Sequence, residues 1–154
     1  MPASPDDHLR PVDPDVDLSD PAQRPRPDWL LLAAIALGGV LGAESRYGIG
    51  RLIVHHGASF PWATVLINAL GAGLLGVLMA VVDARTVHRL LRPFIGVGIL
   101  GGFTTFSTFT VDLDTLLHDH RPGLALGYLV LTVFGCLFAV LAAYRAMLAW
   151  VRES

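Results

Sequence analysis

The chain has 154 residues, of which 53% are hydrophobic and 16% charged, and its formal net charge is −2. The near-neutral charge gives no basis for nucleic-acid binding, and the single cysteine, Cys136, excludes an intrachain disulfide framework and a Cys-x-x-Cys metal site. The hydrophobic residues fall in long blocks, which indicates a membrane protein.

Residues 1–28 differ in composition from the rest of the chain. Five prolines lie among the first 21 residues and seven aspartates among the first 28, while apolar side chains are scarce. Such a segment cannot bury a core, so we predict a disordered N-terminal tail. It lacks the basic start and the short apolar region of a signal peptide, because Trp29 opens a full-length apolar span.

Four apolar segments are long enough to cross a bilayer, which takes about 20 residues in a helix. Uncharged runs begin at Pro61, Pro93 and Pro122, and proline is favoured at the first position of a helix. The first segment, from Trp29, is interrupted by Glu44 and Arg46. We predict an all-α transmembrane domain over 29–151, with helices at about 29–50, 61–83, 93–117 and 122–149.

The distribution of arginine predicts the orientation in the membrane, because basic residues favour the cytoplasmic side. Eight arginines lie on the side of the two termini and three on the opposite side, at 46, 51 and 121. We therefore predict a multi-pass protein of the cell membrane with both termini in the cytoplasm, if the orientation is fixed.

Polar residues recur within the spans at helical spacing. Thr64 and Asn68 are four residues apart and share a helix face, and Tyr128, Thr132 and Cys136 form a similar stripe in the last span. Hydrogen bonding and close packing between helices explain most such residues. For Asn68 the sequence leaves two interpretations open, a pore-facing amide and a structural one.

The stretch "GGFTTFSTFT", residues 101–110, is unusual inside an apolar span. Two adjacent glycines disfavour a continuous helix, and an unwound backbone in hydrocarbon costs several kcal/mol per unpaired group. A break there would direct backbone carbonyls at a cation, as in transporters and channels. The alternative is a Gly/Thr-rich packing surface, which gives no role to Phe106 and Phe109.

Three motifs together resemble those of the fluoride channel family known as Fluc or CrcB. They are "GGVLGAESRYGIG", "FPWATVLINALGAGLLG" and "GILGGFTTFSTFT", one for each of the first three spans. The resemblance extends from Trp29 to about Val151. It implies four helices with a broken third helix, and an antiparallel, dual-topology dimer with two pores.

The resemblance also implies roles for individual residues. Asn68 would lie along the fluoride path, the rings of Phe106 and Phe109 would face the ion with their edges, and the backbone carbonyls of Gly101 and Thr104 would hold a structural sodium ion (Na+) between two subunits. Arg46 and Asp112 would lie in a vestibule. The complete set of predicted pore residues is Thr64, Asn68, Phe106, Thr108, Phe109, Tyr128, Thr132 and Cys136.

Two positions depart from the family pattern. Cys136 stands where a hydroxyl is usual, and a thiol is the poorer hydrogen-bonding group. Glu44 is an unusual charge within a membrane span. Because residues two apart do not share a helix face, we expect Glu44 to reach the membrane interface or Arg51 rather than Arg46.

The predicted function is passive, fluoride-selective export of cytoplasmic fluoride, with no enzymatic activity. One alternative is a small proton-coupled exporter that uses Glu44, and another is a non-conducting partner subunit of a heterodimeric channel. The arginine bias permits either a dual-topology homodimer or a fixed-orientation chain with a related partner. We favour the homodimer because all three motifs occur in this chain.

Overall fold

The computed structural model describes residues 28–53 and 59–153, so that the predicted tail, apart from Asp28, lies outside the described residues. Four segments in this part of the chain are long and apolar enough to cross a membrane, which confirms the prediction of four membrane helices. Three are single helices: α1 (Trp29–Leu52), α2 (Trp62–Ala84) and α5 (Pro122–Glu153). The third comprises the π-helix η2 (Arg92–Leu100), α3 (Gly101–Phe103) and α4 (Ser107–His118).

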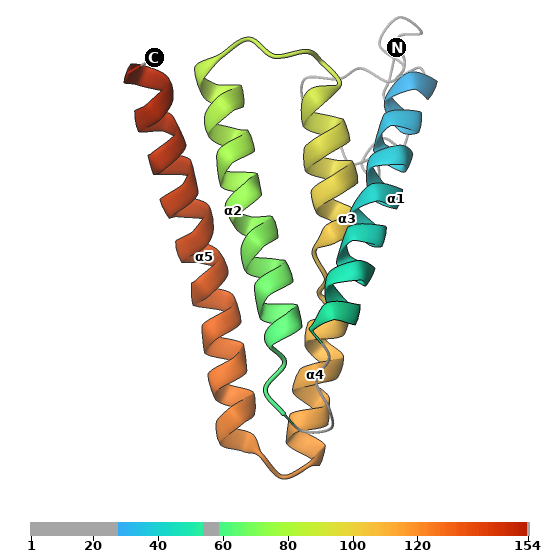
Figure 1. The fold of residues 1–154 in the computed structure, drawn as a ribbon, viewed down its shortest axis with the longest axis vertical. Helices are drawn as coiled ribbons and strands as arrows, with labels where there is room; N and C mark the ends of the chain where they lie inside the picture. The colour runs from blue at the N-terminus through green and yellow to red at the C-terminus, as the bar shows by residue number, and fades with distance from the viewer. Residues whose placement is uncertain (1–27, 54–58, 154) are drawn as a thin grey trace, which may run out of the picture.

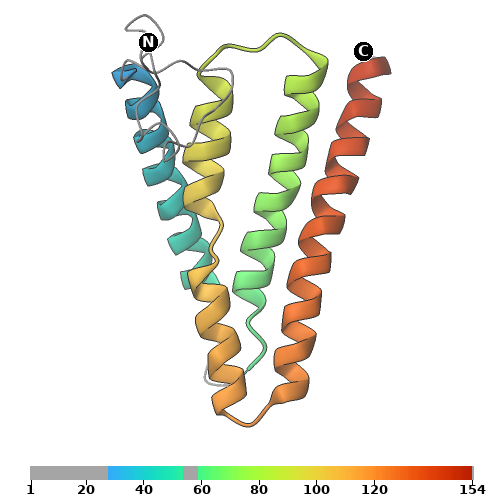
Figure 2. The ribbon, with the colours of Figure 1, turned by 180° about the vertical axis from the view of Figure 1, so that it is seen from behind.

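The helices pack as two pairs that form one open bundle (Figure 1). One pair is α2 with α5, and the other is α1 with η2 and α3. Viewed from behind, α2 and α5 again lie beside each other (Figure 2). The start of α1 and the end of α5 lie at the same end of the molecule, as an even number of spans requires.

Local sequence signals begin and end the helices. The side chain of Asp28 accepts a hydrogen bond from the Leu31 N–H at 3.1 Å and so caps α1. Pro122 occupies the first position of α5, where a missing N–H has no consequence. Between α4 and α5, His120 adopts a left-handed conformation with φ 56°, which turns the chain sharply after α4.

Glycines bring α1 into backbone contact with the third segment. A Cβ atom added at Gly42 would overlap the Ile99 carbonyl, and one added at Gly102 would overlap the Gly39 carbonyl. Gly38 and Gly98 make a similar close approach further along the same helices. Small residues spaced by four are typical of membrane helix interfaces, because they let backbones approach closely. Gly102 therefore allows the third segment to pack closely on α1, and its own backbone is helical.

The most buried side chains gather where α2, α4 and α5 meet. Phe109, Leu116 and Tyr128 form the centre of this cluster, together with Val65 and Ala125. Many other large apolar side chains are exposed on the outside of the bundle, as expected where the surrounding solvent is lipid. The core thus fixes α4 against α2 and α5, while α1 holds the upstream half of the third segment.

The contact between α1 and the third segment can be tested with Gly42→Ala. The added methyl group would meet backbone atoms that cannot move aside, so we expect a loss of about 1–3 kcal/mol in stability. Gly48→Ala is the matched control, because a Cβ there meets nothing within 4 Å and alanine favours the helix. Thermal unfolding of both purified variants measures the difference, and equal stability would contradict the packing argument.

Candidate functional site

The third membrane segment loses helical geometry between α3 and α4. Thr104 has φ −76° and ψ 157°, an extended conformation, and residues 104–106 belong to neither helix. The N–H and the hydroxyl of Thr104 both donate to the Leu100 carbonyl, at 3.0 and 2.9 Å, which closes α3. The departure from the helix therefore begins two residues beyond the Gly-Gly pair that prompted the prediction.

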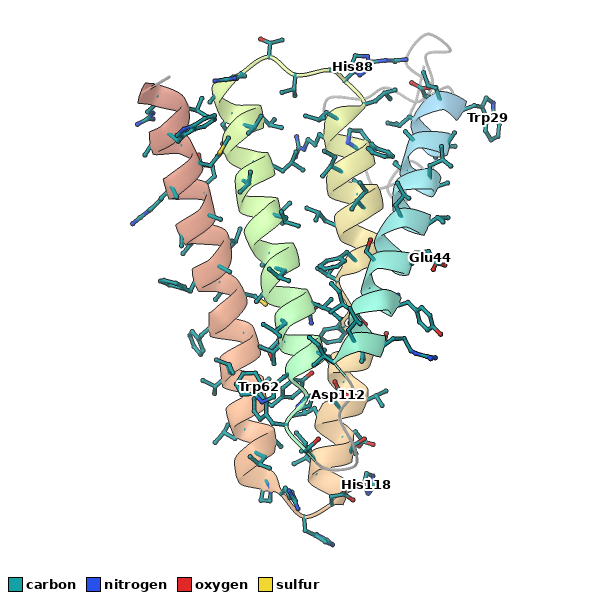
Figure 3. The ribbon with its side chains drawn as sticks, viewed as in Figure 1. Trp29, Glu44, Trp62, His88, Asp112 and His118 are labelled. Atoms are coloured by element: carbon teal, nitrogen blue, oxygen red, sulfur yellow. The ribbon has the colours of Figure 1, made fainter. Side chains whose placement is uncertain are left out.

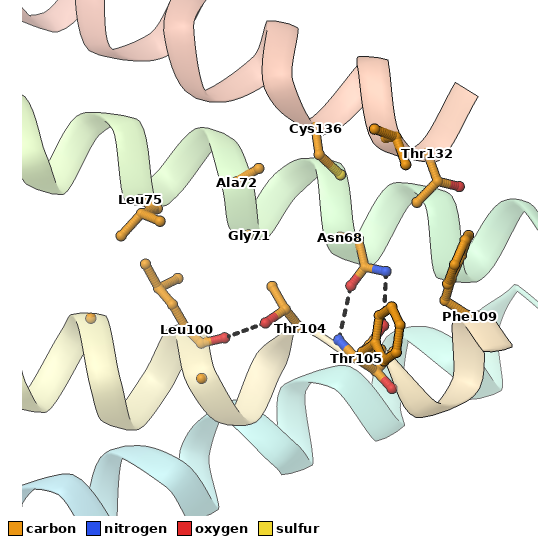
Figure 4. A pocket seen from close by; sticks show the side chains of 14 residues that line it. Asn68, Gly71, Ala72, Leu75, Leu100, Thr104, Thr105, Phe109, Thr132 and Cys136 are labelled. Carbon is orange, nitrogen blue, oxygen red and sulfur yellow. Dashed lines mark hydrogen bonds between the residues drawn. The ribbon is translucent and has the colours of Figure 1, made fainter. Parts of the chain in front are cut away.

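The side-chain amide of Asn68 bonds to the backbone at this point from the neighbouring helix α2 (Figure 4). Its Oδ1 accepts the Thr105 N–H at 2.8 Å, and its Nδ2 donates to the Thr105 carbonyl at 3.0 Å. Both backbone polar groups of Thr105, a residue outside the helices, are thus satisfied by one side chain. One N–H of the Asn68 amide is left for another partner.

The hydroxyl of Thr105 caps the start of the next helix, α4. Its Oγ1 accepts the Thr108 N–H at 3.1 Å and donates to the Thr108 hydroxyl at 2.9 Å, as an N-terminal cap does. In an unbroken helix the N–H groups of Thr105 and Thr108 would bond to the carbonyls of Gly101 and Thr104. Because side chains take both N–H groups, these two carbonyls are released from the helical ladder.

A pocket of about 450 Å³ lies beside this interruption, between the third segment, α2 and α5 (Figure 4). No charged side chain of the described residues lines it. The Thr132 side chain is 7% exposed, and its hydroxyl at the pocket has no hydrogen-bond partner among the described residues. The structure brings together here the predicted residues Asn68, Gly101, Thr104, Phe106, Phe109, Thr132 and Cys136.

The two phenylalanines of the pocket are in different surroundings. Phe109 is 8% exposed and packs on Tyr128, with ring centroids 5.1 Å apart. Phe106 is 80% exposed, although its ring centroid lies 5.8 Å from that of Phe109. A phenylalanine of the core would be covered on all sides, so Phe106 is not filling the core of this chain.

A second pocket, of about 340 Å³, lies on the α1 side of the interruption. Arg46 and Arg51 line it, and its other polar side chains are the hydroxyl groups of Tyr47, Thr64, Thr105 and Thr108. Arg46 donates from Nε to the Gly102 carbonyl at 3.2 Å. Thr105 lines both pockets, so the peptide bonded to Asn68 lies between a positively charged pocket and a neutral one.

Two predicted pore residues instead bond to a buried carboxylate. Asp112, which is 9% exposed, accepts hydrogen bonds from Thr64 at 2.6 Å and from Tyr128 at 3.2 Å. This network joins α2, α4 and α5. Asp112 and Tyr128 line neither pocket, and the Thr64 hydroxyl, although at the second pocket, donates to Asp112.

Glu44 lies on the outside of α1 and is exposed (Figure 3). No ion pair joins it to Arg46 or Arg51 in the described part of the chain, and Arg51 donates instead to the Tyr47 hydroxyl at 3.3 Å. We expected Glu44 to reach either the membrane interface or Arg51. The contact with Arg51 is not made. It lies away from both pockets, whose lining does not include it.

Sequence reasoning missed Thr105 and Arg51 as residues of the site. The signal for Thr105 was present, because a threonine three residues before another hydroxyl at a helix start is a typical cap. Arg51 gave no such signal, since only the approach of α1 to the third segment places it at the second pocket.

Comparison with known proteins gives a family match and several similar proteins. Residues 33–144 match the family described as CrcB-like protein, Camphor Resistance (CrcB). The chain is 48% identical to fluoride-specific ion channel FluC 2 of Thermobifida fusca, over 77% of this chain and 88% of the relative. It is 48% identical to FluC 2 of Nocardia farcinica, over 80% and 89%, and 41% identical to FluC of Thermus thermophilus, over 72% and 90%.

Thr64→Val and Thr132→Val separate a structural hydroxyl from an unpartnered one. Valine keeps the shape of threonine, so each variant removes only the polar group. Thr64→Val should lower the free energy of unfolding by about 1.5–3 kcal/mol, the usual value for a hydrogen bond to a charged group. Thr132→Val should leave it unchanged, because no bond within the described chain is lost. Chemical denaturation in detergent compares the two, and equal losses would contradict these assignments.

Proposed function

Because the chain belongs to the CrcB-like protein family, we propose that this multi-pass membrane protein is a passive channel selective for fluoride, which lets fluoride leave the cytoplasm. The relatives named above support the ion, since each is called a fluoride-specific ion channel. The observation that carries the proposal is the uncharged pocket beside residues 104–106, with the Asn68 amide and the unpartnered Thr132 hydroxyl at its wall.

A fluoride pore must replace tightly held water by hydrogen-bond donors. Asn68 has one N–H beyond the bond to Thr105, and Thr132 has a hydroxyl free of partners among the described residues. Cys136 extends this row on α5 with a weaker donor. Neutral donors suit conduction, because they bind the anion more weakly than charged side chains in direct contact would and so let it leave.

Phe106 and Phe109 would complete the coordination with their ring edges. The edge of a phenyl ring carries partial positive charge, which attracts an anion weakly. Weak attraction at several positions lets an ion enter and leave. The exposed ring of Phe106 and the buried ring of Phe109 face a common pocket, which supports this role.

The second pocket would act as the vestibule. Two arginines in a hollow lined otherwise by neutral side chains raise the local concentration of anions. Arg46 also anchors the Gly102 carbonyl through Nε, which leaves its terminal amino groups for the pocket. The buried charge of Asp112 is partly offset by donors from Thr64 and Tyr128, so it repels an entering anion less.

We propose that the carbonyls of Gly101 and Thr104 hold the structural sodium ion that the resemblance implies. Both are released from the helical ladder, and Gly101 faces open space, since a Cβ added there meets nothing within 4 Å. Oxygen ligands suit a hard cation, which would supply fixed positive charge near the pathway. Replacing sodium by a bulky organic cation should lower the thermal stability of the purified protein, and unchanged stability would contradict the site.

We propose that two copies form the working channel, in antiparallel orientation. Phe106 lines the pocket but is 80% exposed, which supports a second copy that encloses it. A homodimer requires insertion in both orientations, whereas the arginine distribution of eight against three favours one. A reporter fused to the C-terminus should be found on both faces of the membrane. A reporter on the cytoplasmic face alone, without fluoride flux, would mean a second, related chain.

The proposed activity is tested directly in liposomes that contain the purified protein. We expect them to release fluoride and to retain chloride, because the pocket offers donors matched to a small, strongly hydrated anion. Release should not depend on a proton gradient. Equal release of chloride would contradict selectivity, and fluoride movement that needs protons would indicate an exporter.

The role of the rings is tested by Phe106→Leu and Phe109→Leu, which roughly keep side-chain volume. We expect each to reduce fluoride flux about tenfold or more while the protein still folds and assembles. Phe138→Leu is the matched control for Phe106, because Phe138 is similarly exposed, at 74%, but lies on α5 outside the pocket. Flux like that of the parent in both test variants would mean that the rings only fill space.

A further inference from the structure

A third pocket, of about 390 Å³, lies at the opposite end of α1 from the vestibule. It is a groove between the start of α1 and the chain that leads into η2. Its α1 wall is formed by Leu30, Ala33, Ala34 and Leu37, and its other wall by His88, Leu90, Leu91 and Phe94. His88 is the only lining residue with an ionisable side chain, so the groove is apolar with one polar group at its wall.

The groove lies at one end of the membrane spans, where a bilayer would change from hydrocarbon to headgroups. α2 ends at Ala84 and η2 begins at Arg92, so the residues between them connect two spans at the membrane surface. Trp29, at the same end of the molecule as His88, is 74% exposed (Figure 3). An exposed tryptophan at the end of a span is typical of the interfacial layer.

Two hydrogen bonds within its turn hold His88 and leave one ring nitrogen as a donor. Its carbonyl accepts the Leu91 N–H at 2.9 Å, and its Nδ1 accepts the Leu90 N–H at 3.2 Å. Since Nδ1 acts as an acceptor, the proton of the neutral ring is on Nε2. The ring therefore offers an N–H at the groove without a change of conformation.

Two arginines lie close to this donor in sequence. Arg89 and Arg92 flank the groove residues Leu90 and Leu91 in sequence. Arg89 is paired with Asp28 at 3.1 Å, whereas Arg92 has no ion pair with a described residue. An apolar groove with a histidine donor at its wall, and arginines next to it in sequence, matches a molecule with an anionic head and an aliphatic tail.

We propose that this groove is a binding site for an anionic phospholipid. One acyl chain lies along the apolar walls between α1 and η2, and the phosphate accepts hydrogen bonds from His88 Nε2 and from Arg92. Such a lipid joins the start of α1 to the third segment at the headgroup level. This is the helix pair whose glycines meet deeper in the bilayer.

Native mass spectrometry of the purified full-length chain, titrated with phosphatidylglycerol or phosphatidylcholine of the same chains, tests the site. We expect preferential binding of phosphatidylglycerol. His88→Asn, which keeps an acceptor for the Leu90 N–H but loses the Nε2 donor, and Arg92→Gln should each weaken binding about fivefold. Ala34→Phe, which fills the groove, should abolish it for both lipids.

Two control variants match these changes elsewhere. Arg152→Gln removes an arginine from the last turn of α5, and Ala142→Phe adds a ring to an exposed position of that helix. Both should bind phosphatidylglycerol like the parent. Equal binding of the two lipids, or equal losses in test and control variants, would overturn the proposal.

Preference for phosphatidylglycerol that appears only after removal of residues 1–25 would mean that the acidic tail, and not a lipid, occupies the groove. Fluoride flux like that of the parent shows that each variant is folded.

Discussion

The site depends on one interaction, the pairing of the Asn68 side-chain amide with the backbone N–H and carbonyl of Thr105. Inside a bilayer no water is available for an unpaired backbone group, so a peptide outside a helix is stable only when protein satisfies it. Asn68 does so with two hydrogen bonds from α2. By intercepting the Thr105 N–H, the same amide releases the Gly101 carbonyl from the helix. One contact therefore both stabilises the backbone at Thr105 and leaves the Gly101 carbonyl able to bind an ion.

Other interactions hold the interruption in a fixed position. Upstream, the third segment is held by glycines against α1 and by Arg46 on the Gly102 carbonyl. Downstream, α4 is held by the network around Asp112 and by the ring of Phe109 on Tyr128. Because both halves are fixed, the extended residues between them cannot relax into a continuous helix. The two pockets on either side of Thr105 follow from this geometry.

The order of the membrane spans could be predicted from hydropathy and proline positions alone, and the unusual stretch at 101–110 marked where the site lies. The hydrogen-bond partners of the polar residues could not be predicted. Asn68 and Thr105 are 37 residues apart in sequence, and local patterns cannot pair such distant groups. For the same reason Thr64 and Tyr128 looked like free donors, since nothing in their own helices showed that Asp112 would use both. The four-residue spacing of Gly38 with Gly42 and of Gly98 with Gly102 was a usable signal for the α1 contact that went unread. The π-helical winding of η2 had no signal in composition.

The most direct test of the account is the fluoride efflux of liposomes that contain Asn68→Asp. Aspartate has the shape of asparagine and keeps an acceptor for the Thr105 N–H, but it loses both N–H donors of the amide, including the one to the Thr105 carbonyl, and when ionised it adds a negative charge that repels fluoride. We predict a folded, assembled protein whose fluoride flux is reduced at least about tenfold, because one hydrogen bond to an ion is worth about 1.5–3 kcal/mol. Fluoride flux equal to that of the parent, from protein shown to be folded, would contradict this account. The Asn68 amide would then stabilise the backbone at Thr105 without donating a hydrogen bond to fluoride.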